Sequence, residues 1–417
     1  MTSPGAGPWR RTLGILVLGQ VVSSIGFNLA LPFLPLYLGQ LHTLSGGSVV
    51  LWTGVVFAAP ALGMMLAAPV WGWVADRYGR KLMLVRATFS GAVILALMGL
   101  VQSVEQLTVL RVLQGLLTGY IPAVNALAAA TVPADRAGAS FGLLRTATWV
   151  GSGLGPLVGG VMAEQVGFRE SFWLAGALLG LTGLLVLLFV QESFEPPAPR
   201  ERRSFVASYR LVLGAPGLRW LYTLSLLDNL ARSLIVPLIP LFMLALMGTS
   251  GGVASMTGLL FGIRATVAAL AAVFLGYLGD RYGHVRVIAA CAASLVALYI
   301  PQPFVTSAWQ LIALQALTGV AAVGIIPNLS SLLMLRSPEG SSGATYGLDT
   351  SFQSLARAVG PLLGAGVASA FGLGSAFGFV ALIYLVAMVI AGALSGRGAD
   401  AGRRAAGEPA APSLGAR

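Results

Sequence analysis

Two residues of opposite charge lie one helical turn apart in a long apolar stretch of this chain, and they are the first candidates for chemistry. Asp228 lies nine residues beyond Arg219, or ~13 Å along a helix. Arg232 follows four residues later on the same helical face. A buried carboxylate can exchange a proton, and a nearby cation changes its proton affinity. The pair is therefore either a proton carrier tuned by arginine or a permanent neutralising ion pair.

Arginines interrupt other apolar stretches as well. Because arginine stays protonated in proteins, each one needs a carbonyl, a water, a carboxylate or a bound anion as its partner. Asp349 is a second carboxylate candidate, but its place near the end of an apolar stretch is more typical of a charge that starts a helix. The arginines within apolar stretches are Arg111, Arg145, Arg232, Arg264 and Arg357.

Amides and aromatic rings in the same stretches suit an amphiphilic organic ligand. For each ring or amide taken alone, packing is the better explanation. The candidates for proton coupling are Asp228, Arg111 and Arg232. The candidates for substrate binding are Phe27, Asn28, Arg111, Gln114, Asn125, Asp228, Asn229, Arg232, Gln315 and Arg357, with Tyr120 and Asn328 as further polar positions.

The composition excludes whole classes of protein. Of 417 residues, 57% are apolar and 9% are charged, against about 25% charged in soluble domains. A soluble enzyme, a nucleic-acid binder and a disordered protein are therefore excluded. No phosphate-binding loop or cysteine–histidine cluster is present, His42 and His284 fall in expected loops, and we expect neither a cofactor nor a metal.

The apolar stretches predict an all-α membrane protein with twelve transmembrane helices, because backbone in lipid must satisfy its own hydrogen bonds. Nineteen of the 25 basic residues, Arg86 among them, fall on one face if the N-terminus is cytoplasmic, as the positive-inside rule requires. Both termini are then cytoplasmic. The expected helices are 12–38, 49–71, 82–101, 107–131, 137–162, 171–190, 219–246, 253–275, 287–304, 309–334, 343–370 and 374–395.

The chain repeats itself after 204 or 205 residues. Pro32 recurs as Pro237, and Asp76 recurs as Asp280. Two parallel six-helix halves are typical of a transporter whose substrate site lies between them. We expect a first half at 1–190, a cytoplasmic linker at 191–218, a second half at 219–395 and a disordered cytoplasmic tail at 396–417.

Three motifs give the chain a family resemblance. The loop Gly72–Lys81, the sequence Arg111–Gly115 and the glycine-rich run Gly151–Gly160 resemble motifs of the major facilitator superfamily. The last of them is similar to the motif of its drug:proton antiporter branch with twelve helices. The stretches Leu31–Tyr37 and 69–86 look closest to the MdtG-like multidrug-resistance subgroup.

The resemblance implies a gate and two bending helices. Asp76 would meet the start of the helix at 343–370, and Asp280 the start of the helix at 137–162, tying the halves together when the transporter faces outward. The alternative is that these charges only fix topology. The gate residues are Gly72, Asp76, Arg77, Gly79, Arg80, Lys81, Asp280 and Arg281, and the bends lie at Gly151, Gly155, Pro156, Gly159, Gly360 and Pro361.

One position departs from the resembled family. Many relatives carry an acidic residue near Asn28, and an amide cannot titrate. The hypothesis is an inner-membrane exporter, not an enzyme, that exchanges protons for drugs or amphiphilic compounds by alternating access. It would act as a monomer on small molecules, without nucleic acid. The alternatives are a transporter of an organic anion (a phosphonate, carboxylate or sugar acid), an uncoupled facilitator and a receptor, although the short loops leave a receptor no signalling domain.

Overall fold

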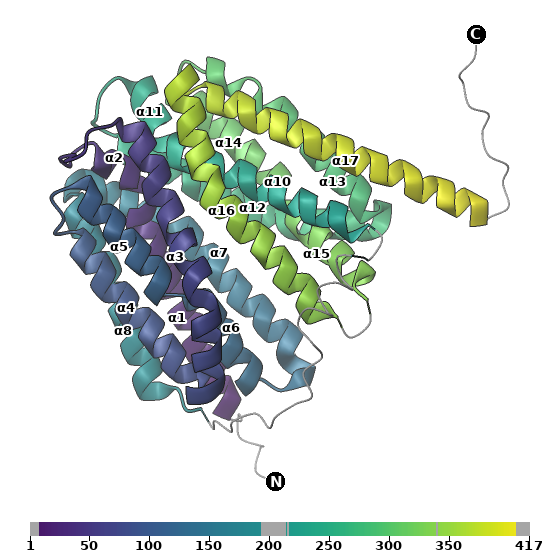
Figure 1. Ribbon diagram of the computed structural model, residues 1–417, viewed down its shortest axis with the longest axis horizontal. Helices are drawn as coiled ribbons and strands as arrows, with labels where there is room; N and C mark the ends of the chain where they lie inside the picture. The colour runs from purple at the N-terminus through teal and green to yellow at the C-terminus, as the bar shows by residue number, and fades with distance from the viewer. Residues whose placement is uncertain (1–7, 193–213, 215–216, 339–340, 406–417) are drawn as a thin grey trace.

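The apolar stretches fold as long helices, as their length and the absence of water in a bilayer require. A computed structural model describes residues 8–192, 214, 217–338 and 341–405 (Figure 1). In the first half the elements are α1 (Pro8–Ala30), η1 (Leu31–Phe33), α2 (Leu34–Leu38), α3 (Val49–Tyr78), α4 (Arg80–Met98), α5 (Val104–Leu117), α6 (Tyr120–Thr131), η2 (Ala134–Arg136), α7 (Ala137–Gln165) and α8 (Phe168–Phe189).

The second half follows the same order. Its elements are α10 (Leu218–Ile235), η3 (Val236–Leu238), α11 (Ile239–Met247), α12 (Val253–Tyr282), α13 (His284–Tyr299), η4 (Gln302–Phe304), α14 (Ala308–Val323), α15 (Ile325–Arg336), α16 (Ser342–Phe371) and α17 (Ser375–Ala405).

Several predicted spans are interrupted helices. The span at 12–38 changes to a 3-10 turn at Leu31–Phe33, and the span at 219–246 does so at Val236–Leu238, because the prolines beside these turns cannot donate a helical hydrogen bond. The span at 107–131 breaks between α5 and α6, where Gly119 has a φ of 73°. Only glycine adopts that conformation without strain.

We had expected the motif at Gly72–Lys81 to form a loop, but most of it is helical. Helix α3 continues to Tyr78 and α4 begins at Arg80, so only Gly79 lies between them, with a φ of 96°. Gly283 makes the same turn between α12 and α13 with a φ of 94°. His284, which we expected in a loop, is the first residue of α13.

Eleven spans within the described ranges are long and apolar enough to cross a membrane. The remaining expected span is α7, which has 29 residues and is therefore long enough. Its many glycines, together with Arg145 and Glu164, lower its hydropathy. The twelve-helix expectation thus agrees with the helices observed, although α7 is not recognised by composition.

The two halves repeat each other in space. In the first half, α1 packs against α7 and α8, and α3 packs against α5. In the second half, α10 packs in the same way against α16 and α17, and α12 against α14. Between the halves the extensive contacts are those of α7 with α12 and of α3 with α16. The parallel repeat predicted from the sequence is therefore present in the packing.

The halves approach most closely at one end of the bundle. We call the end where α1 begins and α17 ends the termini end, and the opposite end the distal end. Gly160 contacts Ala254 and Gly258 near the distal end, and Gly54 contacts Pro361 and Ala365 there. Toward the termini end the helices of the two halves diverge (Figure 1). The structure is therefore closed at its distal end.

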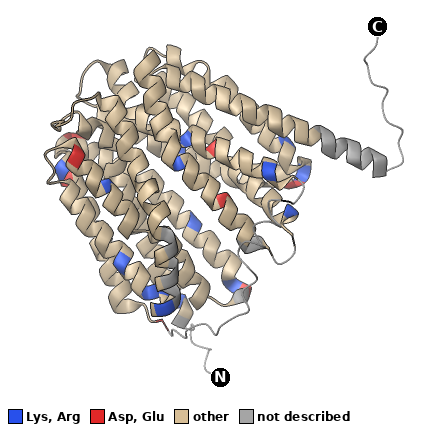
Figure 2. Ribbon diagram, in the orientation of Figure 1, with Lys and Arg blue, Asp and Glu red and all other residues tan. Residues whose placement is uncertain are grey.

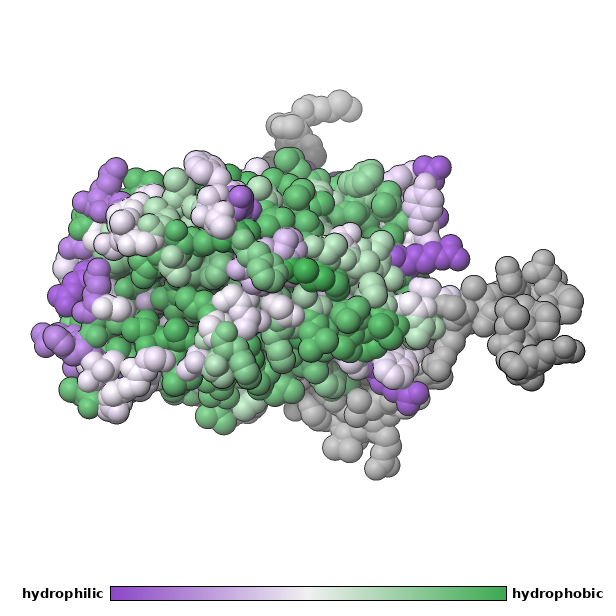
Figure 3. Space-filling view, turned by 90° about the horizontal axis from the view of Figure 1, so that it is seen from above, coloured by the Kyte–Doolittle hydropathy of each residue, from purple (hydrophilic) through white to green (hydrophobic). Residues whose placement is uncertain are grey.

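Charge and hydropathy are distributed as a membrane requires. Most charged residues lie toward the two ends of the bundle (Figure 2). Apolar side chains form a broad band between polar ends on the face seen in Figure 3. A few charges remain in the middle of the bundle, and they define the candidate site.

Three expectations need correction or lie outside the described residues. Helix α17 runs to Ala405, so the start of the predicted disordered tail is helical, because alanine and arginine favour a helix and no proline stops it. The rest of the tail, and nearly all of the predicted linker, lie outside the described residues. Arg86, which we counted with the charges at the membrane face, lies within α4.

Candidate functional site

A cavity of about 340 Å³ lies between the two halves. Its wall combines residues that are far apart in the sequence, from α1 and α7 of the first half and α10, α12 and α14 of the second, which only the packing of the two halves brings together. The lining residues are Asn28, Pro32, Thr148, Trp149, Ser152 and Pro156 from the first half, and Arg232, Val236, Phe261, Arg264, Ala265, Ala268, Gly319, Ala322 and Val323 from the second half.

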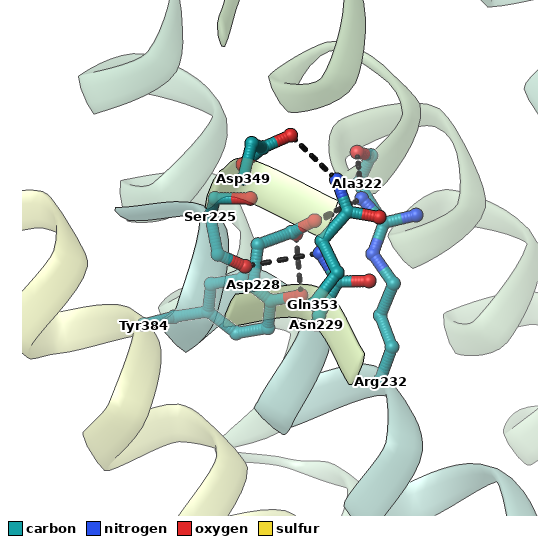
Figure 4. Close-up of polar contacts among 8 residues, drawn as sticks. All are labelled: Ser225, Asp228, Asn229, Arg232, Ala322, Asp349, Gln353 and Tyr384. Carbon is teal, nitrogen blue, oxygen red and sulfur yellow. Dashed lines mark hydrogen bonds and ion pairs between the residues drawn. The ribbon is translucent and has the colours of Figure 1, made fainter. Parts of the chain in front are cut away.

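The Asp228–Arg232 pair forms as the helical spacing predicts. Arg232 Nη2 lies 2.9 Å from Asp228 Oδ1 and 2.7 Å from Oδ2. The same nitrogen donates to the Ala322 carbonyl oxygen at 2.8 Å. Tyr384 of α17 donates to Asp228 Oδ1 at 3.2 Å (Figure 4). Asp228 is therefore held from both sides, and its arginine partner lines the cavity.

A second cation, Arg264, lines the same cavity as Arg232. Arg264 of α12 donates through Nη1 to Gln315 Oε1 at 3.0 Å. Gln315 is fully buried and donates in turn to Gln302 Oε1 at 2.8 Å. Gln315 therefore acts behind the cavity wall, through Arg264. The interhelical hydrogen bond expected of Arg264 is present, and its side chain also faces the cavity.

Asp349 is buried rather than a solvated charge at a helix start. It lies in the second turn of α16 with a relative exposure of 7%, beside Ser225 of α10 (Figure 4). Gln353 donates to its Oδ2 at 2.7 Å. Arg357 donates to the Gln353 side chain and backbone, but its own side chain is exposed. Arg357 and Asp349 therefore share Gln353 as a hydrogen-bond partner.

Arg111 lies outside the cavity wall, against our expectation for a binding residue. Its Nε donates to the Val56 carbonyl oxygen at 3.0 Å, and its Nη1 donates to Gln114 Oε1. The residue four positions after Val56 is Pro60, which has no backbone N–H to offer that carbonyl. Arg111 therefore replaces the hydrogen bond that proline removes from α3.

The other amides and rings of the predicted set are spread over different environments. Asn28 lines the cavity and donates to the Ser24 carbonyl oxygen and to Ser152 Oγ. Phe27 packs on Tyr120 inside the first half, with ring centroids 6.2 Å apart. Three amides also lie outside the cavity lining: Asn125 is exposed on α6, Asn229 donates to the Ser225 carbonyl oxygen, and Asn328 donates to the Leu275 and Gly324 carbonyl oxygens.

The Asp280 part of the predicted gate is not formed in this structure. The side chain of Asp280 is 73% exposed and lies 3.6 Å from His284, across the Gly283 turn in its own half, rather than at the start of α7. The Asp76 side chain lies outside the described residues. The backbone N–H groups of Arg80 and Lys81 donate to Glu192, which therefore caps α4. Arg77 and Arg281 lie beside the rings of Tyr78 and Tyr282.

The glycine stripes serve close packing. Gly151, Gly155 and Gly159 of α7 face α1, where an added Cβ would meet the backbone of that helix. Gly360 of α16 faces Ser233 of α10 in the same manner. Helices α7 and α16 pass through Pro156 and Pro361 without interruption. The packing interpretation of these residues thus has direct support, whereas their bending during transport stays a prediction.

Sequence reasoning missed Tyr384, Thr148 and Ser152. Tyr384 is an ordinary aromatic residue of α17, and its contact with Asp228 spans 156 positions. The two hydroxyl residues lie in the glycine-rich α7. No local pattern marks them, because their role depends on which helix faces the cavity.

The comparisons with known proteins agree with this architecture. A model of the Major Facilitator Superfamily matches residues 16–263 and 221–414. The chain is 36% identical over 369 residues to multidrug resistance protein MdtG of Enterobacter lignolyticus (strain SCF1), a match that covers 87% of each chain. It is 35% identical to MdtG of Salmonella arizonae, over 87% of this chain and 90% of that protein.

Solved structures share the fold at low identity. A bacterial homolog to the human lysosomal transporter Spinster, in an inward-facing and unoccupied conformation, matches with a TM-score of 0.78 and 15% identity over 93% of this chain and 97% of that chain. The human organic anion transporter MFSD10 matches with a TM-score of 0.66 and 20% identity over 94% of this chain and 100% of that chain. The chain belongs to the major facilitator superfamily of membrane transporters, in the group of the MdtG multidrug resistance proteins.

Proposed function

We propose that this protein is a proton-coupled exporter of drugs or other amphiphilic organic compounds, working by alternating access across the inner membrane. The observation that carries the proposal is a buried carboxylate, Asp228, whose arginine partner lines the cavity between the halves. A protonatable group coupled to the substrate site is what antiport requires. The relatives named multidrug resistance protein support the class of cargo.

The coupling step follows from the contacts of Asp228. When Asp228 is ionised, it holds Arg232 by an ion pair, and Arg232 in turn holds the Ala322 carbonyl of α14. A proton on Asp228 removes the charge that attracts Arg232. The guanidinium is then free to change partners, toward the substrate or toward other cavity oxygens. Asn28 and the hydroxyl of Ser152 supply neutral hydrogen-bonding groups on the opposite wall.

The orientation of the chain completes the proposal. We place both termini in the cytoplasm, because most of the 25 basic residues then fall on that side. The termini end is then cytoplasmic, and the observed closure at the distal end corresponds to access from the cytoplasm. The protein would work as a monomer, because each half finds its partner within the same chain.

The test uses purified protein in liposomes with an imposed pH gradient and a trapped pH dye. A panel of lipophilic cations, neutral drugs and organic anions is added from outside. We expect substrate-driven proton movement in the wild type and none in Asp228→Asn. Asp135→Asn is the matched control, because Asp135 is exposed on the surface with Arg136 as its partner. Normal coupled export by Asp228→Asn refutes the role of this carboxylate.

A second cargo class has an observation of its own in favour. Arg264 lines the cavity, and within the described part of the chain its side chain donates to a neutral amide rather than to a carboxylate. An unneutralised guanidinium suits a carboxylate or a phosphonate. In the same liposomes, proton movement driven by anions alone, and lost in Arg264→Gln, would assign an organic anion as the cargo. Flux without any proton movement would instead indicate a facilitator.

A further inference from the structure

A second cavity, of about 190 Å³, lies inside the first half and apart from the central one. It is bounded by the second half of α3, the start of α4 and the break between α5 and α6. Two arginines line it, and its described lining includes no acidic residue. The lining residues are Met64, Ala67, Trp71, Arg80, Met83, Arg86, Gly115, Thr118, Gly119, Pro122, Ala123 and Ala126.

Backbone carbonyls freed by the break between α5 and α6 accept hydrogen bonds from side chains of the neighbouring helices. Trp71 Nε1 donates to the Leu116 carbonyl oxygen at 2.6 Å, and Ser90 Oγ donates to that of Leu117 at 3.0 Å. Arg86 Nη2 donates to the Thr118 carbonyl oxygen at 2.9 Å. That carbonyl needs a donor, because the residue four positions on is Pro122. Repair of the break therefore uses only one nitrogen of Arg86.

The rest of the Arg86 guanidinium is unsatisfied. Its Nε and Nη1 are shielded from water and have no hydrogen-bond partner. The guanidinium carbon lies 3.4 Å from the centroid of the Trp71 ring, so the group is fixed in place by stacking. Buried donors without partners are costly and uncommon in proteins. Nε–H and Nη1–H lie on different edges of the guanidinium, and each can donate one charge-assisted hydrogen bond, for which an oxyanion is the strongest acceptor.

The second half lacks this arrangement, so the fold itself does not require it. In the repeat, Trp71 corresponds to Leu275, Arg86 to Ala290 and Gly119 to Gly324. At that break the side chains of Leu275 and Cys291 lie directly against Gly324 and fill the space. A feature confined to one half indicates a function of that half rather than a need of the helix break.

We propose that the cavity beside Arg86 binds the oxyanion head of an amphiphile, a carboxylate or phosphate, whose chain leaves along the exposed apolar side of α3. Arg86 is the ligand, Arg80 adds positive charge, and Trp71 forms the apolar wall. At about 190 Å³ the cavity takes a head group rather than a whole drug. Met64, which lines the cavity, is 38% exposed, so the cavity reaches the outer surface of α3 there. This site goes beyond the proposed export function.

The test measures binding, not transport, so its result is independent of the proposed export. Decyl phosphate and decanoate are titrated into the delipidated full-length protein in decyl maltoside, with decanol as the uncharged probe, and bound molecules are counted by native mass spectrometry. We expect one site for each oxyanion and about tenfold weaker binding in Arg86→Gln, the loss typical of one charge-assisted contact. Decanol binding should not change.

The control has the same charge change elsewhere. Arg145 is an exposed arginine of α7, remote from the cavity lining, so Arg145→Gln should bind both oxyanions as the wild type does. Equal binding by Arg86→Gln and wild type, or an equal loss in Arg145→Gln, overturns the proposal. If Arg86→Gln does not fold, Arg86→Lys decides: it keeps the charge but loses the Nε–H and Nη1–H donors, so oxyanion binding should fall while decanol binding stays.

A further arm identifies the source of the head group. The protein is reconstituted in nanodiscs of phosphatidylcholine with or without phosphatidylglycerol, and then released into the mass spectrometer. Retention of one phosphatidylglycerol by the wild type and not by Arg86→Gln assigns the site to a membrane lipid. Binding of decanoate or decyl phosphate without retained lipid assigns it to a free amphiphile. Binding of none of these probes overturns the proposal.

Discussion

The two halves share one helix order and one set of contacts, but their buried arginines have different partners. In the first half, Arg111 donates to the Val56 carbonyl and to Gln114, which are both neutral. In the second half, Arg232 pairs with the buried carboxylate of Asp228. The first arginine repairs a helix at Pro60, whereas the second neutralises a group that can change its charge. The buried arginines of the two halves stand at positions that are not equivalent in the repeat, and they have different roles.

The helix breaks between α5 and α6 and between α14 and α15 also differ in the side chains that surround them. Arg86 and Trp71 leave a charged cavity at the break between α5 and α6. At the break between α14 and α15, Leu275 and Cys291 fill the space. Asn328 Oδ1 there accepts a hydrogen bond from His284 Nδ1. The fold requires a satisfied break in both halves, and each half achieves it with different chemistry.

The largest effect is expected for Arg232→Ala. This change leaves Asp228 buried and without its cation, which typically costs ~3–5 kcal/mol. Unfolding of the purified protein in detergent measures the loss. The double variant Asp228→Asn with Arg232→Gln should recover most of the stability, because no unpaired charge remains, but should not recover coupled transport. Full stability of Arg232→Ala would contradict the importance of this ion pair.

Arg111→Ala should cost less, ~1–3 kcal/mol, because it leaves neutral hydrogen-bonding groups without partners rather than a buried charge. Pro60→Ala is the matched background, since alanine supplies the N–H that the Val56 carbonyl lacks. In that background the cost of Arg111→Ala should fall, and a double-mutant cycle measures the difference. If Arg111→Ala is stable but loses proton coupling, Arg111 has the coupling role that the sequence predicted, and not only a structural one.

The smallest effect is expected at the contact between halves near the distal end. Glu164 of α7 accepts from the backbone N–H groups of Gly252 and Ser255 at the start of α12. A carboxylate at a helix N-terminus contributes ~0.3–1 kcal/mol. Glu164→Gln should therefore shift the access equilibrium about two- to fivefold away from the distally closed state. Spin-label distances between the distal ends of α7 and α12, in a Cys291→Ser background, measure the shift.

Glu105 supplies the control for this comparison. It accepts from the backbone N–H groups of Leu44 and Ser45, at 2.9 and 3.1 Å, all within the first half. Glu105→Gln loses a similar charge without touching the contact between the halves. A shift in the same distances by Glu105→Gln would show that the effect of Glu164 is not specific to the interface.

The sequence predicted the helices, the repeat and the Asp228–Arg232 pair, because each depends on local periodicity or on spacing within one helix. It did not predict the hydrogen bond from Arg111 to the Val56 carbonyl oxygen, since that bond requires α5 to lie against α3 at Pro60. It underestimated Asp349, whose burial depends on the packing of α16 against α10. It placed Arg86 at the membrane face, whereas α4 begins at Arg80 and carries it inward.

The sequence by itself determined the class of the protein. Too few charges for a soluble surface, long apolar stretches and a repeated set of glycines and prolines leave a membrane bundle of two related halves. Only the tertiary structure decided which polar residues meet in the cavity, because helical periodicity gives the face of a residue but not the helix opposite that face. Tyr384, Arg264 and Ser152 acquire their roles from neighbours that lie far away in the chain.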